Sequence, residues 1–357
     1  MKIERLGKED RQKTRPLYEE VFAEDSAEFV QYYYQNKVPF NEIFVAKEGD
    51  QICGMAHLNP YLLSADKKEI YGAYLVAVAT KKEFRHRGIM TALLKEIFDF
   101  LYEKRYPFLY LMPASEAIYT PFDFRFFYSQ RQKTWQAGYV RQKNKDGIML
   151  SLREVQEEDL SVLSRTLNEI LSQKYRLFAS RTPDYLRDLQ RELRAMNGKM
   201  IVIWHGAECI GSFQLIQESE TMILEPLFKE EYQLSASEKI QEFLEREYAD
   251  EIIKIAADDK SEKTESARKP WMMERIIHLE RWVSQLKSEE RKVIQMKIND
   301  PWIAENEGWY EITVEKEGGI IRRIEPQNGI IQVSIADLPQ FFKTEDPMAD
   351  SFFNEWV

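Results

Sequence analysis

Cysteine and histidine are scarce in this 357-residue chain, which contains two cysteines and four histidines. Cys53 and Cys209 each lie in an apolar segment of strand length, where a cysteine behaves as a small buried hydrophobic residue. The four histidines show neither the spacing of zinc ligands nor a serine and aspartate partner in the sequence. We therefore expect no metal site, no hydrolytic triad, and a reducing, cytoplasmic compartment.

Long apolar runs and an excess of positive charge are also missing. No apolar stretch approaches the roughly 20 residues that a membrane span requires, and the opening MKIERLGKED lacks the apolar region expected of a signal peptide. The formal net charge of −10 argues against nucleic acid as a general partner and suits a small cationic substrate such as an amine. Hydrophobic residues make up 44% of the chain, which is enough to form buried cores in two or three domains.

The glycine patterns of the best-known phosphate loops are absent as well. Neither G-x-x-x-x-G-K-[ST] nor G-x-G-x-x-G occurs, so the sequence predicts neither a P-loop nor a dinucleotide fingerprint. Residues 72–100 predict a different anion site. The apolar run Ala73–Thr80 has the length of a strand, and the basic turn of residues 81–88 follows it. Apolar residues then recur at the spacing of a helix with one buried face.

This strand, turn and helix together predict a phosphate site. Unpaired amides at the start of the helix carry partial positive charge, and Gly88 allows the backbone to approach a ligand closely. Arg85, His86 and Arg87 add side-chain donors. The sequence Arg85-x-x-Gly88-x-Met90 resembles the acetyl-CoA signature of the GNAT acetyltransferases, [QR]-x-x-G-x-[GA], with methionine in place of the usual small last residue. A basic turn before a helix is also typical of a solvated cap, but the apolar strand in front of it favours the coenzyme.

The chain contains a second copy of its opening pattern. Residues 152–159, LREVQEED, resemble IERLGKED of residues 3–10, and the predicted hairpin of residues 201–215 resembles that of residues 43–58. Sequence similarity between segments at a fixed separation is typical of a duplicated unit. The second copy has no counterpart of the basic turn, so we expect it to be a structural or pocket-forming domain without a coenzyme site.

The last part of the chain changes pattern again. From about residue 289, apolar and polar residues alternate between turn residues, which predicts an antiparallel sheet. The chain ends in FFNEWV, residues 352–357. Because most chain ends are polar, this apolar ending predicts a tail that is buried against the protein.

Duplicated GNAT-like halves followed by a small α+β domain resemble the Eis-like (enhanced intracellular survival) acetyltransferases, whose third domain is similar to a sterol carrier protein. The motifs that carry this resemblance are VAVATKKEFRHRGIM (76–90), SEAIYTPFDF (115–124), PWMMERII (270–277) and FFNEWV (352–357). The predicted fold is therefore α+β with mixed sheets. It has a GNAT domain with the acetyl-CoA site in residues 1–140, a second GNAT-like domain lacking the CoA motif in 141–284, and a sterol-carrier-protein-like domain in 285–357. The resemblance also implies a homo-oligomer, a hexamer or a trimer.

The resemblance implies specific roles for individual residues. The pantetheine of acetyl-CoA pairs with the strand at Val78 and Thr80, and its pyrophosphate lies on the backbone amides of the turn. Tyr119, which matches the tyrosine of the family's S-E-x-x-I-Y-x-x-F run, is the general acid, and the terminal carboxylate of Val357 is the general base. The lack of a proline at Lys82 departs from the family's commonest pattern. The full set of expected coenzyme-binding residues is Val78, Ala79, Thr80, Arg85, His86, Arg87, Gly88, Ile89, Met90 and Ser115.

Acetyl transfer to an amine needs a base for the ammonium proton and an acid for the departing thiolate. A tyrosine has an ordinary pKa of about 10, somewhat above the value of about 8.5 for a thiol, and it can protonate a developing thiolate if the site holds the two groups close. A terminal carboxylate titrates near 3.5 and suits an amine only if burial raises its pKa or water relays the proton. Glu355 and Glu116 are rival bases, and Glu116 with Ser115 also suits a simple cap of the next turn. The expected contacts of the amine are Asp25, Tyr33, Glu116 and Glu355, although Tyr33 also suits a core position.

Two functions stay open at this point. One is an N-acetyltransferase that transfers acetyl from acetyl-CoA directly to a small cationic amine, such as an aminoglycoside, a polyamine or a lysine-like group. Direct attack is expected because neither cysteine lies in a cationic motif that would activate it. The other is a non-catalytic acyl-CoA- or lipid-binding regulatory protein. Tyr119 and a free terminal carboxylate favour the enzyme, because a binding protein needs neither of them.

Overall fold

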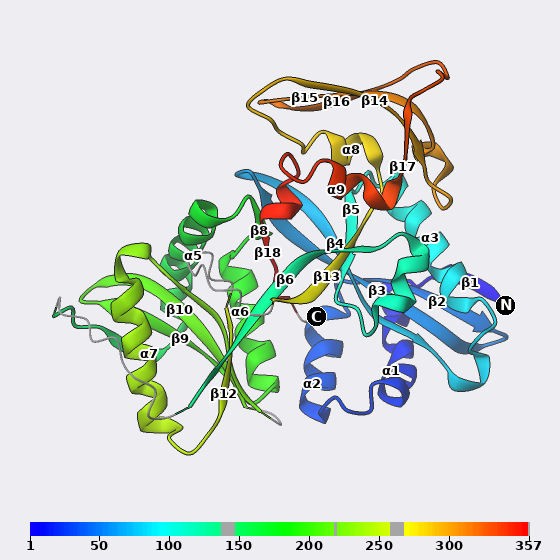
Figure 1. Ribbon diagram of the computed structural model, residues 1–357. Helices are drawn as coiled ribbons and strands as arrows, with labels where there is room; N and C mark the ends of the chain where they lie inside the picture. The colour runs from blue at the N-terminus through cyan, green and yellow to red at the C-terminus, as the bar shows by residue number, and fades with distance from the viewer. Residues whose placement is uncertain (137–146, 218–219, 258–267, 356–357) are drawn as a thin grey trace.

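The computed structural model describes residues 1–136, 147–217, 220–257 and 268–355 (Figure 1). Its first half carries strands β1 (Lys2–Arg5), β2 (Glu42–Glu48), β3 (Gln51–Ala65), β4 (Lys68–Thr80), β5 (Phe108–Leu111) and β6 (Arg125–Trp135). The helical segments of this half are η1 (Lys8–Thr14), α1 (Arg15–Val21), α2 (Ala27–Tyr32), η2 (Tyr33–Lys37), η3 (Lys82–Phe84), α3 (Ile89–Glu103), α4 (Glu116–Tyr119) and η4 (Thr120–Phe122). None of the helices within the described ranges is long and apolar enough to cross a membrane.

The predicted strand, turn and helix of residues 72–100 are confirmed. Strand β4 ends at Thr80, and helix α3 begins at Ile89 after Gly88. Leu93, Leu94 and Phe98 on the apolar face of α3 are almost completely buried against the central sheet. Burial of this face fixes α3 against the sheet, so that its first turn lies near the end of β4.

The second half repeats the order of the first. Its strands are β7 (Ser151–Glu154), β8 (Leu177–Ala179), β9 (Lys199–His205), β10 (Glu208–Gln217), β11 (Thr221–Phe228) and β12 (Ile253–Ala257). Its helical segments are η5 (Glu157–Asp159), α5 (Leu160–Lys174), α6 (Pro183–Ala195), η6 (Glu230–Tyr232) and α7 (Gln233–Glu247). The predicted hairpin at residues 201–215 is present as β9 and β10, which pair in antiparallel fashion.

A shared irregularity supports the duplication at the level of single residues. The ladder between β3 and β4 has one extra residue on β4 beside Ala77, whose φ is 50°. The ladder between β10 and β11 has one extra residue on β11 beside Glu225, whose φ is 45°. A bulge of this kind bends the strand and re-aims the side chains next to it. Both halves therefore carry the same bend at the same place in the repeat.

The two halves share one continuous sheet because they exchange strands. Among the described residues fourteen strands belong to this sheet, and its main path runs β1-β2-β3-β4-β5-β13-β6-β12-β11-β10-β9-β7. Strand β13 (Arg268–Ile276) follows β12 in the chain but lies between β5 and β6. Strand β6 in turn pairs with β12 of the second half. Figure 1 shows β6 and β13 between the two halves. The segment 268–276, which the predicted division gives to the second domain, thus pairs with strands of the first half.

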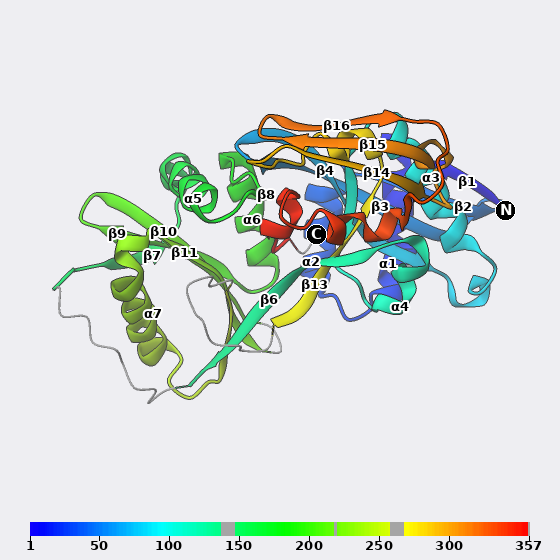
Figure 2. The same ribbon diagram turned by 45° about the horizontal axis from the view of Figure 1, so that its top comes forward.

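The third part of the chain forms a separate small sheet that lies over the first half (Figure 2). Its elements are α8 (Leu279–Val283), β14 (Lys292–Asn299), η7 (Ala304–Asn306), β15 (Gly308–Glu315), β16 (Gly318–Arg323), β17 (Ile331–Ser334), η8 (Ile335–Asp337) and α9 (Leu338–Phe341). The predicted antiparallel pairing holds for β14, β15 and β16. Strand β17 pairs in parallel with β14 instead, because the chain crosses from one edge of the sheet to the other before it.

The tail returns from this small sheet to the junction of the two halves. After η9 (Pro347–Asp350), strand β18 (Ser351–Phe352) pairs in parallel with β8, which also pairs with β3. The rings of Phe352 and Phe353 are buried, so the prediction of a buried tail is confirmed as far as Glu355. Val357 lies outside the described residues.

Candidate functional site

The sheet of the first half opens next to strand β4. Strands β4 and β5 pair in parallel at Ala73 with Leu109 and at Tyr74 with Tyr110, whereas β4 continues to Thr80. Over this last stretch β4 still pairs with β3 on its other side. The edge that faces β5 is therefore available to an extended ligand, which can bind as an added strand. Three of the predicted coenzyme residues, 78–80, lie on this stretch.

The turn after β4 has the shape of an anion-binding loop. His86 and Gly88 adopt left-handed conformations with φ values of 62° and 75°. Left-handed residues in a turn can direct neighbouring amides toward one concave side, and the first amides of α3 have no acceptor within the helix. A Cβ atom on Gly88 would meet nothing within 4 Å, so glycine serves the backbone conformation there and not a tight fit.

Basic side chains surround this turn and are exposed. Arg85 donates from Nε to the carbonyl of Thr80 at 3.2 Å, which ties the turn back to the end of β4. The guanidinium of Arg87 lies 5.1 Å from the centre of the Phe84 ring. The structure therefore brings the predicted residues 80 and 85–90 together at one end of the opening beside β4.

Tyr119, at the end of α4, is almost completely buried. Its ring packs edge-on against Phe124 at 5.8 Å and belongs to the apolar cluster against which Val78 and Met90 also pack. Burial raises the pKa of Tyr119 to about 12. The hydroxyl therefore keeps its proton at neutral pH. Ser115, at the N-cap position of this helix, makes no capping hydrogen bond with its side chain.

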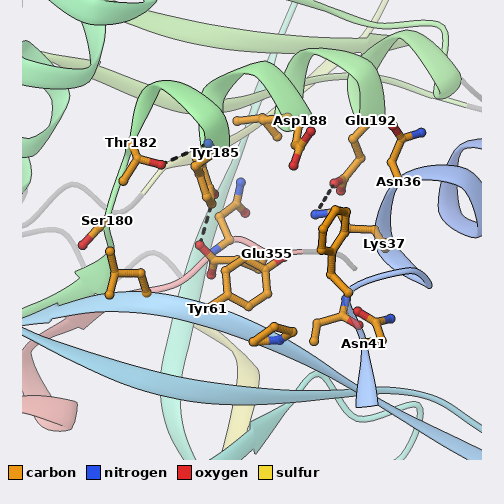
Figure 3. A pocket seen from close by; sticks show the side chains of 16 residues that line it. Asn36, Lys37, Asn41, Tyr61, Ser180, Thr182, Tyr185, Asp188, Glu192 and Glu355 are labelled. Carbon is orange, nitrogen blue, oxygen red and sulfur yellow. Dashed lines mark hydrogen bonds and ion pairs between the residues drawn. The ribbon is translucent and has the colours of Figure 1, made fainter. Parts of the chain in front are cut away.

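A pocket of about 250 Å³ lies on the other side of the sheet, where the two halves meet (Figure 3). Figure 3 shows Thr182, Tyr185, Asp188 and Glu192 of the α6 region above it, and Asn36, Lys37 and Asn41 of the first half at its side. The sixteen lining residues are Asn36, Lys37, Phe40, Asn41, Asn59, Pro60, Tyr61, Leu62, Ser180, Thr182, Tyr185, Asp188, Leu189, Glu192, Asn354 and Glu355. Three carboxylates and one ammonium group are among them, so the pocket is acidic.

The buried carboxylate of Glu192 is held from the first half. It accepts a hydrogen bond from the hydroxyl of Tyr32 at 3.1 Å and lies 3.4 Å from the Lys37 ammonium. Burial raises the pKa of Glu192, and the charge of Lys37 works against that rise. Within the described part of the chain, no group of three or more His, Cys, Asp or Glu side chains is placed to hold a metal ion.

Arg181 joins the second half to the tail below the pocket. Its fully buried guanidinium lies 2.7 Å from Glu225 and 3.2 Å from Glu355, and 4.6 Å from the centre of the Tyr185 ring. Burial opposes its charge, but the carboxylates of Glu225 and Glu355 hold the pKa of Arg181 above its ordinary value. Glu225 is the bulge residue of β11, so the irregularity that the two halves share supplies a charge to this cluster.

A row of aromatic rings connects the pocket to the opening beside β4. The ring of Tyr61 lies 6.4 Å from that of Tyr185 and 6.1 Å from that of Tyr74. Tyr74 stacks on Tyr110 at 5.1 Å, and Tyr110 contacts Phe353 of the tail at 4.9 Å. Tyr74 and Tyr110 are the residues at which β4 and β5 part. The pocket on one face of the sheet therefore lies next to the point where the sheet opens.

The four predicted amine contacts lie in different places. Glu355 lines the pocket and accepts a hydrogen bond from Tyr185 at 3.3 Å. Asp25 lies between α1 and α2 and accepts from the Tyr18 hydroxyl at 2.7 Å, and burial raises its pKa. Tyr33 is fully buried. Glu116 is exposed at the start of α4. The structure brings only Glu355 of these four into this pocket.

Several residues of the pocket were not predicted from the sequence, above all Lys37, Tyr185 and Glu192, and neither was Arg181 below it. Their partners lie in other segments, and hydrogen-bond partners such as Tyr32 and Glu192 are 160 positions apart. One signal was nevertheless present. Tyr185 and Glu192 share a face of α6 at helical spacing with an apolar residue between them, so a carboxylate stands within a buried stripe.

The sequence of the first half matches a known family. Residues 2–127 match the family described as "Acetyltransferase (GNAT) domain". No curated protein matches this sequence. The matched residues contain the opening beside β4, the basic turn and Tyr119.

Solved structures share the fold of nearly the whole chain. A protein of Enterococcus faecalis V583 described as a "Probable N-Acyltransferase" has a TM-score of 0.79 at 16% identity, covering 95% of this chain and 88% of that one. Eis1 of Mycobacterium abscessus has a TM-score of 0.69 at 13% identity, covering 96% and 89%. A tandem GNAT protein from the clavulanic acid biosynthesis pathway has a TM-score of 0.51 at 12% identity, covering 77% and 99%. The predicted mixed α/β fold with tandem GNAT-like halves is thereby confirmed.

Proposed function

We propose that this protein, an acyl-CoA-dependent acetyltransferase by its N-terminal GNAT domain, transfers acetyl from acetyl-CoA directly to a small cationic amine. The observation that carries the proposal is the course of β4. The strand leads from Tyr74, beside the acidic pocket, to Thr80, before the anion-binding turn. A coenzyme with its pyrophosphate on the turn and its pantetheine along the free edge of β4 would present its thioester toward the pocket.

The reaction needs two proton transfers. The amine enters as an ammonium ion, gives its proton to a base, and attacks the thioester carbonyl carbon. The carbon–nitrogen bond forms, the carbon–sulfur bond breaks, and the thiolate takes a proton. Tyr119 suits the second transfer, because burial keeps its hydroxyl protonated at neutral pH and it can donate to a developing thiolate that the site holds close. The products are the acetamide and free CoA.

For the base we propose the terminal carboxylate of Val357, from the resemblance to Eis-like enzymes. This residue lies outside the described residues. The support for the proposal is that the last described residues of the tail, Asn354 and Glu355, line the pocket wall. Glu355 itself is a weaker candidate, because its carboxylate is already bound by Arg181 and Tyr185.

From the same resemblance we also propose a division of the chain at residues 140 and 284 and a likeness of residues 285–357 to a sterol carrier protein. We further propose a trimeric or hexameric assembly and a cytoplasmic location. The second candidate function, a non-catalytic acyl-CoA- or lipid-binding regulator, would use the turn and β4 in the same way. It would need no acid beside the thioester, which is why the buried Tyr119 favours the enzyme.

Replacing Gly88 with alanine tests the coenzyme site. We expect the affinity for CoA, measured by calorimetry, to fall about 10-fold, because alanine disfavours the left-handed backbone that aims the amides of the turn. Gly49 provides a matched control. It lies in the turn between β2 and β3 with a φ of 60°, and a Cβ there also meets nothing within 4 Å. Both variants should lose about 1 kcal/mol of stability. Equal CoA affinity in Gly88→Ala and Gly49→Ala would place the coenzyme elsewhere.

Extending the chain beyond Val357 by two glycines tests the proposed base. The extension moves the terminal carboxylate, so we expect kcat with an accepted amine to fall at least 10-fold while CoA affinity is retained. The same two glycines added before Met1 are the control. Normal turnover of the C-terminally extended chain would mean that another group removes the proton.

A further inference from the structure

The side chain of Asn59 is buried in the wall of the acidic pocket with both of its polar atoms unpaired. Asn59 is 2% exposed and lines the pocket. Neither its Nδ2 nor its Oδ1 has a hydrogen-bond partner among the described residues. Buried polar groups are nearly always paired, because an unpaired one destabilises the fold by about 1–3 kcal/mol. A buried carboxamide without hydrogen-bond partners in a pocket wall therefore indicates that a bound ligand supplies them.

The strand around Asn59 presents a neutral polar face. His57, Asn59 and Tyr61 occupy every second position of β3, so their side chains lie on the same face of the strand. Tyr61 also lines the pocket. His57 accepts from or donates to the Tyr33 hydroxyl through Nδ1 at 2.9 Å, and Nδ2 of Asn41 donates to the same hydroxyl at 3.3 Å. Burial lowers the pKa of His57 to about 3, so the imidazole is uncharged at neutral pH. Behind the pocket, therefore, the strand offers amide and imidazole groups without charge.

The charged groups of the pocket differ from Asn59 in having partners already. Glu192 is bound by Tyr32 and Lys37. Glu355 is bound by Arg181 and Tyr185. The presence of carboxylates in the pocket is explained if they attract a cationic substrate. This attraction does not explain why the neutral carboxamide of Asn59 is there. A carboxamide is complemented by a neutral group that offers an acceptor and a donor side by side.

We infer that the amine acceptor carries, close to its reacting amine, a neutral group that both donates and accepts hydrogen bonds, and that Asn59 binds this group. A carboxamide and a pair of vicinal hydroxyls share this chemistry. The inference rests on the proposed function and narrows it, because simple alkyl diamines lack such a group. The pocket volume of about 250 Å³ lies below the roughly 300–1,000 Å³ typical of drug-sized ligands, which fits a small acceptor.

A matched pair of acceptors tests the inference. Lysinamide is cadaverine with one carboxamide added next to an amine, and 3-aminocyclohexane-1,2-diol is cyclohexylamine with two vicinal hydroxyls added next to the amine. We expect kcat/KM to favour the substituted member of at least one pair by 10-fold or more, and the pair that shows it identifies the group. In Asn59→Leu the same preference should fall to within about twofold, because leucine keeps the branched shape of the side chain and loses both polar atoms. A wild-type enzyme without either preference overturns the inference.

Two controls separate recognition from folding. Asn36 lines the same pocket, but its Nδ2 already donates to the carbonyl of Tyr32 at 3.0 Å, so Asn36→Leu should keep the preference. Asn59→Leu should unfold at the same temperature as the parent or higher, since it removes no hydrogen bond of the fold. A clearly lower unfolding temperature would mean that the larger leucine side chain does not fit this buried position, and Asn59→Asp then decides between the two outcomes. Asn59→Asp keeps the shape without the donor and should lose the carboxamide preference, which covers the case in which the leucine variant does not fold.

Binding measurements distinguish failure of this inference from failure of the proposed function. Calorimetry of lysinamide and cadaverine is done on the CoA complex, without acetyl transfer. If no amine is acetylated but lysinamide binds more tightly in a manner that depends on Asn59, the transferase proposal fails and the inference stands. If both amines are acetylated and Asn59→Leu leaves their ratio unchanged, the transferase proposal stands and the inference fails.

Discussion

Tyr119→Phe is expected to lower kcat about 100-fold or more while the affinity for acetyl-CoA stays the same. Removal of a positioned general acid typically lowers rates by about 10²–10⁴-fold. Tyr119 suits that role because it is buried in the cluster that Val78 and Met90 join, and its pKa of about 12 keeps it protonated throughout the neutral range. Steady-state kinetics with a saturating amine gives kcat, and calorimetry gives the coenzyme affinity.

Tyr106 provides the matched control for this change. It also packs against the same apolar cluster, so Tyr106→Phe removes a hydroxyl from that region without touching α4. Tyr106→Phe should turn over at the parent rate. A Tyr119→Phe enzyme as fast as Tyr106→Phe would remove the tyrosine from the mechanism. A weaker coenzyme affinity in Tyr119→Phe alone would assign it a binding role instead.

Arg181→Met is expected to destabilise the protein by about 3–5 kcal/mol. The guanidinium is fully buried and compensates the carboxylates of Glu225 and Glu355, neither of which is exposed. Methionine fills a similar volume but leaves two uncompensated buried charges, and this is the costly case for a buried ion pair. The protein is unfolded with guanidinium and the transition is followed by circular dichroism. The shift of its midpoint gives the loss of stability.

Two further variants define what Arg181 does. Arg187, on the same segment, forms ion pairs with Glu157 and Asp184 at the surface, and Arg187→Met should change the midpoint little because water screens such pairs. Replacing Glu225 and Glu355 with glutamine in the Arg181→Met background should recover much of the loss, because the buried carboxylates become neutral. Equal midpoints for the Arg181 and Arg187 variants would contradict this account of the cluster.

Local pattern was sufficient to predict the strand, turn and helix to which we assign the coenzyme. The strand that ends at Thr80, the turn with Gly88 and the helix from Ile89 depend on residues close in sequence, through apolar periodicity and a glycine that allows positive φ. The repeat of the opening pattern was also visible in the sequence. The structure adds that both copies keep the same bulge, beside Ala77 and beside Glu225.

Pairing between distant segments was not predictable in the same way. The sequence gives no signal that β13 inserts between β5 and β6, or that β17 runs parallel to β14. A strand pattern shows which face is buried, but it does not show which neighbour supplies the hydrogen bonds. That choice depends on how the halves pack, and many pairings satisfy the same pattern.

The sequence alone therefore determined the elements, the duplication and the anion-binding turn, because short-range sterics and periodic burial act within a few residues. Only the tertiary structure decided the pocket that we propose for the acceptor. Arg181 meets Glu355 across 174 positions, Tyr32 meets Glu192 across 160, and Asn59 lines the same pocket from strand β3. The charge, shape and unpaired carboxamide of that pocket arise from segments that become neighbours only when the two halves and the tail close on one another.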